Sequence, residues 1–408
     1  MQPTGAPDTG ADSEDSIDCS VLVPVLNEER YIRASVSAMR AQQFGGRLEF
    51  ILVDGGSTDR TRSILEELAH EDPRIRVFDN PRGDTPSGLN VALRHARGRW
   101  VARMDGHTAY PPDYVALGIE RLQQGGTTWV SGPQVPRGEG PVSRAVALAL
   151  GTPLGRGGSK KWGPPSPRIP PGPGDGPAPP ARPTTLSAAV PNVGEYELDS
   201  GVFAGVWERA TVLRYGGWDE RWLRNQDSEM AGRFLAGGER LVCLPQMAAQ
   251  YTPRDSIKSL WRQYWQYGDY REKTALRHPH TMRRSHLIAP SLVATVFAAV
   301  AAPRPVRRVA RIGVGAYVAA LAAAGVHAAG QAEQPADALR VPLVLAVMHL
   351  AHGAGSIKGA IRRGPPLAAI ALILGREELA AQFMRPDQRV YAPSLDGSAG
   401  AVGEADDL

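Results

Sequence analysis

The chain is poor in cysteine, with only Cys19 and Cys243 among its 408 residues. The two lie far apart, lack the spacing of metal ligands and stand in apolar stretches. We therefore expect both to be buried as small apolar residues, and nothing in this pattern implies an oxidising compartment. The chain also lacks a run of lysine and arginine interleaved with aromatic residues, and its net charge is only +4. These features exclude a protein specialised for binding nucleic acid.

Two segments are too rich in polar residues, glycine or proline to fold into a core. Residues 1–18 contain no apolar run of the kind found in a signal peptide, so we expect a disordered tail. Residues 155–192 are saturated with proline and glycine, which excludes a helix or a central strand. We expect a solvated, polyproline-like loop there; the alternative is a docking sequence for a proline-recognition partner.

Between residues 19 and 132, strand patterns alternate with helix patterns. Predicted strands occupy 19–24, 48–54, 75–79, 100–104 and 127–131, and predicted helices occupy 28–42, 58–70, 86–96 and 113–124. Such alternation predicts right-handed crossovers and an α/β fold with a mostly parallel sheet flanked by helices. Ser57 is the expected N-cap of the second helix.

Three of these strands end in polar residues. Their sequences are VLVPVLNEERY at 21–31, FILVDGGSTDRT at 50–61 and WVARMDGH at 100–107. In an open α/β sheet the ligand crevice lies beyond the carboxyl ends of the strands. The side chains that we expect to converge there are Asn27, Glu28, Asp54, Asp105 and His107.

Six motifs occur in a recognisable order. PVLNEE (24–29), VDGGSTDRT (53–61) and MDGHT (104–108) are followed by GGWDE (216–220), RNQDSEM (224–230) and RQYWQYGDYR (262–271). The set resembles an inverting family-2 glycosyltransferase with the GT-A fold, in particular the succinoglycan-type branch of that family. The resemblance extends from about residue 20 to residue 286 and is interrupted by the proline-rich insertion.

The resemblance implies a UDP-sugar donor. By analogy, Pro24, Asn27 and Glu28 would contact uracil and ribose, and Asp54 would accept a hydrogen bond from the uracil ring. The alternative role for Asp54 is that of an acid placed favourably at the start of a helix. Further donor contacts are expected at Gly88 and Asn90, where the family's loop passes the nucleotide, and at Arg271, on the family's basic diphosphate-binding helix. Lys273 is a second candidate to assist the leaving group.

The Asp-Gly-His element stands where the family has its DxD motif, with histidine replacing the last acid. The resemblance implies that Asp105 contacts ribose or metal and that His107 binds a divalent cation through its neutral imidazole. The expected cofactor is Mn²⁺ or Mg²⁺, and a histidine ligand leans towards Mn²⁺. Such an ion would neutralise the charge that develops on the leaving diphosphate. The alternative is a simple turn.

The segment RNQDSE stands where the family has its catalytic ED signature, with Gln226 in place of the usual glutamate. We expect Asp227 to be the general base that takes the proton of the acceptor hydroxyl, and direct in-line attack then inverts the anomeric centre. Glu229 is the alternative base. Gln226 and Trp218 are expected on the acceptor side, although Trp218 fits a core position equally well.

Apolar segments follow at 287–302, 312–330, 341–355 and 365–375, and of these only 312–330 is an uncharged run long enough to span a bilayer. The positive-inside rule then predicts a hairpin between 312 and 355 with the 331–338 loop outside. We expect 287–302 to be interfacial or re-entrant. The alternative is a soluble, alanine-rich helical domain.

The sequence thus predicts a tail (1–18), a GT-A domain (19–286), membrane-associated helices (287–376) and a polar tail (377–408). The expected function is transfer of a hexose from a UDP-sugar to a lipid-linked or growing polysaccharide acceptor at the cytoplasmic face of the cell membrane. Two rivals stay open: a catalytically silent nucleotide-sugar-binding scaffold, and a soluble glycosyltransferase that modifies a small molecule or protein.

Overall fold

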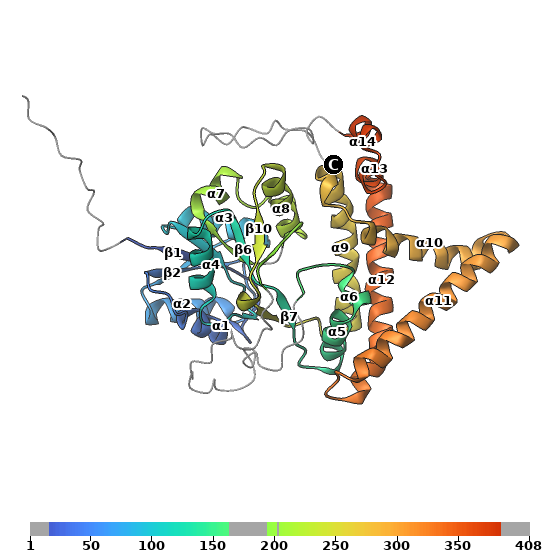
Figure 1. The fold of residues 1–408 in the computed structure, drawn as a ribbon. Helices are drawn as coiled ribbons and strands as arrows, with labels where there is room; N and C mark the ends of the chain where they lie inside the picture. The colour runs from blue at the N-terminus through green and yellow to red at the C-terminus, as the bar shows by residue number, and fades with distance from the viewer. Residues whose placement is uncertain (1–15, 163–193, 202–203, 385–408) are drawn as a thin grey trace, which may run out of the picture.

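The structure is a computed structural model that describes residues 16–162, 194–201 and 204–384 (Figure 1). The predictions made for residues 1–15, for 163–192 of the proline-rich insertion and for 385–408 of the polar tail lie outside the described residues.

An eight-stranded sheet forms the centre of the α/β half of the molecule. Its strand order is β3-β2-β1-β4-β9-β6-β10-β8, and the first four strands are mutually parallel. Two strands run against this direction: β9 is antiparallel to both β4 and β6, and β8 is antiparallel to β10. The strands are β1 (Cys19–Val25), β2 (Leu48–Asp54), β3 (Ile75–Asp79), β4 (Trp100–Arg103), β6 (Trp129–Ser131), β8 (Tyr196–Glu197), β9 (Gly205–Glu208) and β10 (Leu241–Cys243). A second, three-stranded sheet contains β5 (Thr108–Ala109), β11 (Ala249–Tyr251) and β7 (Gln134–Pro136).

Helices cover both faces of the large sheet. One face packs against α1 (Ile32–Arg40), α2 (Thr61–Glu71) and α4 (Tyr114–Gln123), and the other packs against α3 (Thr85–His95), α7 (Arg209–Arg214) and α8 (Gln226–Ala236). The split follows from strand geometry, because successive side chains point to opposite faces: Val21 and Val23 join the first cluster and Leu22 joins the second. The predicted α/β class with a mostly parallel sheet is confirmed.

Two local predictions have different outcomes. Cys19 and Cys243 are free, fully buried thiols, one in each core cluster, as expected. The N-cap at Ser57 is wrong, because α2 begins only at Thr61 and the Ser57 hydroxyl instead donates a hydrogen bond of 2.6 Å to the Asp54 carboxylate. Ser57 therefore stabilises the loop that precedes the helix.

The second half of the molecule is helical. Figure 1 shows α9 and α12 side by side, with α5 and α6 against them and α10 and α11 projecting as a V. The helices are α5 (Pro141–Gly151), α6 (Pro153–Arg156), α9 (Ile257–Arg277), α10 (Ile288–Ala301), α11 (Arg304–Ala329), α12 (Pro335–Arg363), α13 (Leu367–Ile373) and α14 (Glu377–Phe383). Short 3₁₀ turns lie at Pro245–Met247, Pro279–Thr281 and Arg284–Leu287.

Glycines allow α9, α10 and α12 to touch through their backbones. A Cβ atom at Gly268 of α9 would lie 2.0 Å from the carbonyl oxygen of His352, and one at Gly355 of α12 would lie 2.1 Å from that of Trp265. Gly353 stands in the same relation to Ala289 of α10, at 2.2 Å. These distances are too short for any side chain, so α12 is held tightly against α9 and α10.

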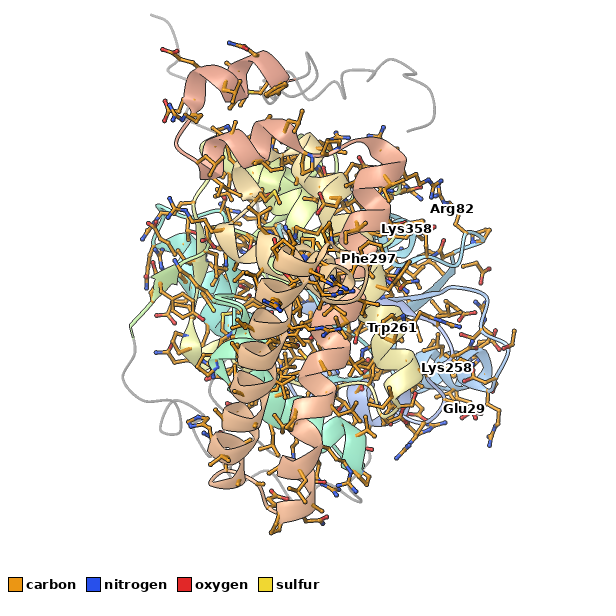
Figure 2. All side chains as sticks on the ribbon, turned by 90° about the vertical axis from the view of Figure 1, so that its right-hand side faces the viewer. Glu29, Arg82, Lys258, Trp261, Phe297 and Lys358 are labelled. Carbon is orange, nitrogen blue, oxygen red and sulfur yellow. The ribbon has the colours of Figure 1, made fainter. Side chains whose placement is uncertain are left out.

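Among the described residues, three helices are long and apolar enough to cross a membrane, by length and composition: Arg284–Ala301, Arg304–Ala329 and Pro335–Arg363. The sequence pattern had predicted one such run. The first two expose large apolar side chains, among them Phe297, which is 72% exposed on the face turned to the viewer in Figure 2. The third is half-buried within the protein.

The predicted hairpin with its 331–338 loop outside is wrong. Asp337 is 1% exposed, and its carboxylate accepts a hydrogen bond of 2.7 Å from Arg144 of α5. The Gln334 side chain accepts another from the same guanidinium, at 3.0 Å. The loop is bonded to α5, which begins only five residues after β7, and five residues span at most about 18 Å. It therefore cannot lie across a bilayer from the sheets, since the hydrocarbon core alone is about 30 Å thick.

Candidate active site

A cleft of about 1820 Å³ runs from the carboxyl ends of β1 and β4 to the helices α9, α10 and α12. Most of the predicted site residues line it. These are Pro24, Asn27, Glu28, Asp105, His107, Gln226, Asp227 and Arg271. Asp54, Gly88, Asn90 and Trp218 lie behind its walls, as described below.

The wall at β1 and β2 is closed by reciprocal hydrogen bonds. Asn27 adopts a left-handed conformation (φ 55°), and its side-chain oxygen accepts a hydrogen bond from the Thr58 backbone at 2.8 Å. The Asn27 backbone N–H in turn donates to the Ser57 hydroxyl at 2.9 Å. Asp54, 4% exposed, accepts the hydroxyl proton of the same serine. Asp54 thus stabilises the loop that contains Ser57 and does not itself line the cleft, whereas its neighbours Val53 and Gly55 do.

Two predicted donor residues support other parts of the site. Gly88 packs close to Pro24, because a Cβ atom added there would lie 3.4 Å from that of the proline. Asn90 holds the backbone of Trp218 through two bonds, donating to its carbonyl oxygen at 2.8 Å and accepting from its N–H at 2.9 Å. Trp218 is 2% exposed and packs edge-on against Trp207. Of the two interpretations offered for Trp218, the structure favours the core.

Arg103 is a central residue of the cleft that the sequence analysis missed. It ends β4, is 3% exposed, and donates to both carboxylate oxygens of Asp105, at 2.9 and 3.2 Å. Its Nη1 donates to Asp227 at 2.7 Å. Burial alone would lower the pKa of Arg103, but the charges of Asp105 and Asp227 raise it above its ordinary value. The guanidinium therefore stays charged and links the two carboxylates. The sequence does contain a signal for this role: Arg103 stands in the apolar strand predicted at 100–104, and a charged residue in a buried strand requires charged or polar partners.

Asp227 lies in the first turn of α8, facing the cleft. Burial raises its pKa, the charge of Asp105 adds to this effect, and the positive charges of Arg103 and Lys161 oppose it. A carboxylate with a raised pKa is a better proton acceptor near neutral pH than an exposed aspartate. The position and the electrostatics of Asp227 both suit a general base.

Glu229, the alternative base, has a different environment. Its fully buried carboxylate forms three contacts of 2.8–3.0 Å with Arg233 and lies 3.2 Å from Nε2 of His278. Burial would raise its pKa, but the charge of Arg233 and the hydrogen bond from His278 lower it to about 2. Glu229 does not line the cleft, and its interactions anchor α8.

His107 is fixed by Glu28. Its Nδ1 lies 2.8 Å from the Glu28 carboxylate, and both residues line the cleft. Burial lowers the pKa of His107, but the hydrogen bond and charge of Glu28 outweigh this and raise it overall. An Nδ1–H donated to a carboxylate leaves Nε2 as the acceptor, which is the arrangement usual for metal-binding histidines.

The two basic candidates for the leaving group lie in different places. Lys273 donates to the Arg221 carbonyl at 2.9 Å and stacks on Trp222 at 4.3 Å, so it supports the α9 surface outside the cleft. Arg271 faces the cleft, and its Nη1 is buried without a hydrogen-bond partner among the described residues.

Comparison with known proteins places these observations in context. Residues 20–168 match the family described as "Glycosyl transferase family 2". The succinoglycan biosynthesis protein ExoA of Rhizobium meliloti is 28% identical over 347 residues, which cover 85% of this chain and 96% of ExoA. The uncharacterized glycosyltransferase EpsJ of Bacillus subtilis is 34% identical over 106 residues, which cover 26% of this chain and 29% of EpsJ. The solved structure of the mannosyltransferase PcManGT from Pyrobaculum calidifontis in complex with GDP-Man and Mn²⁺ has 19% identity, covers 87% of this chain and 90% of that chain, and superposes with a TM-score of 0.46.

Proposed function

The chain belongs to glycosyltransferase family 2, and we propose that it transfers a hexose, with inversion, from a UDP-sugar to a lipid-linked or growing polysaccharide acceptor. The observation that carries this proposal is the Asp105–Arg103–Asp227 arrangement in one cleft. It supports a donor site and a proton acceptor side by side, joined by one buried cation. The full-length similarity to a protein of succinoglycan biosynthesis supports a polysaccharide product.

In this mechanism Asp227 takes the proton of the acceptor hydroxyl while that oxygen attacks the anomeric carbon from the face opposite the diphosphate. Arg103 orients the Asp227 carboxylate through its 2.7 Å bond, and its charge favours the ionised form. Gln226, which lines the cleft beside Asp227, is placed to bind an acceptor hydroxyl. A single displacement with one base inverts the anomeric centre.

A divalent cation suits the residues at the donor end. No group of three histidine, cysteine or acidic side chains that could hold a metal occurs among the described residues. Asp105 and Nε2 of His107 would provide two ligands, and cations of this class often complete their shell with water and substrate phosphates. When bound, the ion supplies charge neutralisation for the departing UDP.

The membrane side of the proposal rests on α10 and α11. Their exposed apolar residues include Ile288, Phe297, Val300 and Ile312. Full crossings by α10 and α11 would place Arg304 and Arg308 on the face opposite the α/β half, against the positive-inside rule. We therefore place both helices in the near leaflet of the cytoplasmic face, where the arginines meet anionic headgroups.

A donor screen with the full-length protein in detergent and Mn²⁺ tests the function. UDP-sugars are expected to release UDP when an acceptor is present, and the product should have the opposite anomeric configuration. Retention of configuration, or release from GDP-sugars alone, would refute the proposal. Asp227→Asn is the matched control for release that depends on Asp227.

A further inference from the structure

A group of basic side chains lies beyond Asp227, at the end of the cleft next to α10 and α12, and the mechanism above does not use it. Lys161 follows α6, Arg271 belongs to α9, His286 lies in the turn before α10, and His352 belongs to α12. All four line the cleft. They are called the basic cluster below.

Helix crossings bring the cluster together. Gly268 lies one turn before Arg271 on α9, and a Cβ atom there would touch the His352 carbonyl. Gly353, the next residue of α12, contacts the backbone of Ala289 on α10. Because these contacts leave no room for side chains, the ends of Arg271, His286 and His352 face the same space. The cluster is therefore a fixed feature of the fold.

Within the described part of the chain, the charges of the cluster are only partly offset, because Asp227 acts on Lys161 and Glu272 acts on Arg271. Burial lowers the pKa of Arg271 to about 10, and the neighbouring charge of Arg283 adds to this. Burial likewise lowers the pKa of Lys161 to about 8, with Arg271 and Arg283 adding to it. Nη1 of Arg271 and Nδ1 of His352 are buried without a hydrogen-bond partner there. Arg271 and Lys161 repel each other, and burying two such cations beside an unpaired donor is costly unless an anion binds between them.

Apolar residues adjoin the cluster. Ile288 and Leu292 of α10 and Met348 of α12 line the same cleft. A second hollow of about 390 Å³ opens beside Ile288 and Leu292 and reaches Gly313 of α11. An anion held by the cluster could therefore carry an apolar chain that leaves between α10 and α11.

We propose that the basic cluster binds the phosphate groups of a lipid phosphate acceptor, whose apolar chain lies against α10 and α11 and whose sugar points back to Asp227. This inference rests on the proposed function and names the acceptor class. It assigns Arg271 to the acceptor rather than to the donor diphosphate, because Arg271 lines the cleft where α9 meets α12 and the apolar residues of α10 adjoin it. A phosphate dianion satisfies the free donors of Arg271 and Lys161 together.

Calorimetry on the full-length protein in detergent tests the proposal, with farnesyl diphosphate as the probe and saturating UDP and Mn²⁺ present to fill the donor site. Arg271→Gln and Lys161→Gln are each expected to weaken farnesyl diphosphate binding about 10- to 100-fold, the loss typical of one charged hydrogen bond. Arg271→Lys should recover part of the affinity. Lys160→Gln is the matched control, because Lys160 is exposed and lies outside the cleft lining.

The outcomes separate the possibilities. Inorganic pyrophosphate binding as tightly as farnesyl diphosphate would show a soluble anion site and overturn the lipid assignment. Competition between farnesyl diphosphate and UDP for one site would return Arg271 to the donor. Equal affinity in wild type and Arg271→Gln would also overturn the proposal. UDP binding, measured separately, reports on the proposed function: its absence would refute the donor site even if farnesyl diphosphate bound to the cluster.

Discussion

Asp227 and Glu229 are two residues apart, yet the structure predicts opposite consequences when their charges are removed. Asp227→Asn leaves Arg103 bonded to both oxygens of Asp105, and the asparagine oxygen still accepts from Nη1. The change replaces one charged hydrogen bond by a neutral one, which costs about 1 kcal/mol or less. The loss of a general base lowers turnover by about 10²- to 10⁴-fold. Donor affinity should change little, because the lost group acts on the acceptor.

Glu229→Gln removes the negative charge that neutralises Arg233 in a fully buried pair. Breaking such a pair on one side costs about 3–5 kcal/mol. For a domain of this size that corresponds to a fall of about 6–20 °C in melting temperature. The enzyme that remains folded should retain most of its turnover, since the Glu229 carboxylate does not line the cleft.

The assay combines UDP release with a melting curve on the same full-length preparations. The expected pattern is an inactive but stable Asp227→Asn and an active but unstable Glu229→Gln. Near-normal turnover of Asp227→Asn at unchanged stability would refute the general-base assignment. A stable but inactive Glu229→Gln would show that the catalytic base lies two residues further along α8.

Three further predictions follow from the same geometry. Calorimetric binding of UDP should require Mn²⁺ or Mg²⁺ and weaken about tenfold or more in His107→Ala, and undiminished binding with chelator would contradict the metal role. Arg103→Lys should move the acid limb of the pH profile of turnover to higher pH. A lysine would be placed less well to stabilise the Asp227 carboxylate, so the pKa of Asp227 would rise further and the base would be protonated at a higher pH. An acid limb that stays in place or moves to lower pH would argue against the Arg103–Asp227 pair. A cysteine introduced by Gln331→Cys should react with an impermeant maleimide added from the cytoplasmic side, whereas the buried Cys19 and Cys243 should not react. Reaction only from the opposite side would support the predicted hairpin instead.

The strands and their polar ends could be predicted because the signals are local. A parallel strand buried on both faces is a short apolar run, and the residues that end it face the ligand crevice wherever the strand lies in the sheet. This is why Asn27, Glu28, Asp105 and His107 were placed together from sequence. Asp54 belongs to the same pattern, but its carboxylate accepts a hydrogen bond from Ser57, three residues later, and does not line the cleft.

The missed and mistaken features depend on contacts between distant parts of the chain. Arg103 is paired with a carboxylate 124 positions away, so its role appears only when α8 is placed beside β4. The segment that became α12 is apolar because it packs against α9 and α5, and hydropathy does not distinguish protein neighbours from lipid. The positive-inside rule then predicted the 331–338 loop on the outer side of the membrane. The ion pair between Arg144 and Asp337 instead holds this loop against α5.

The charges along the cleft explain how a buried aspartate can serve as a base. Burial alone raises the pKa of Asp227 and favours its protonated form, whereas an isolated ion pair with Arg103 would lower that pKa and weaken the carboxylate as a base. The structure combines both effects: Arg103 is shared with Asp105, so it only partly stabilises the Asp227 charge, and Asp105 opposes it. A ligand that engaged Asp105 would leave more of the Arg103 charge for Asp227. In the proposed mechanism, donor binding at one end of Arg103 would thereby be coupled to proton transfer at the other through a single side chain.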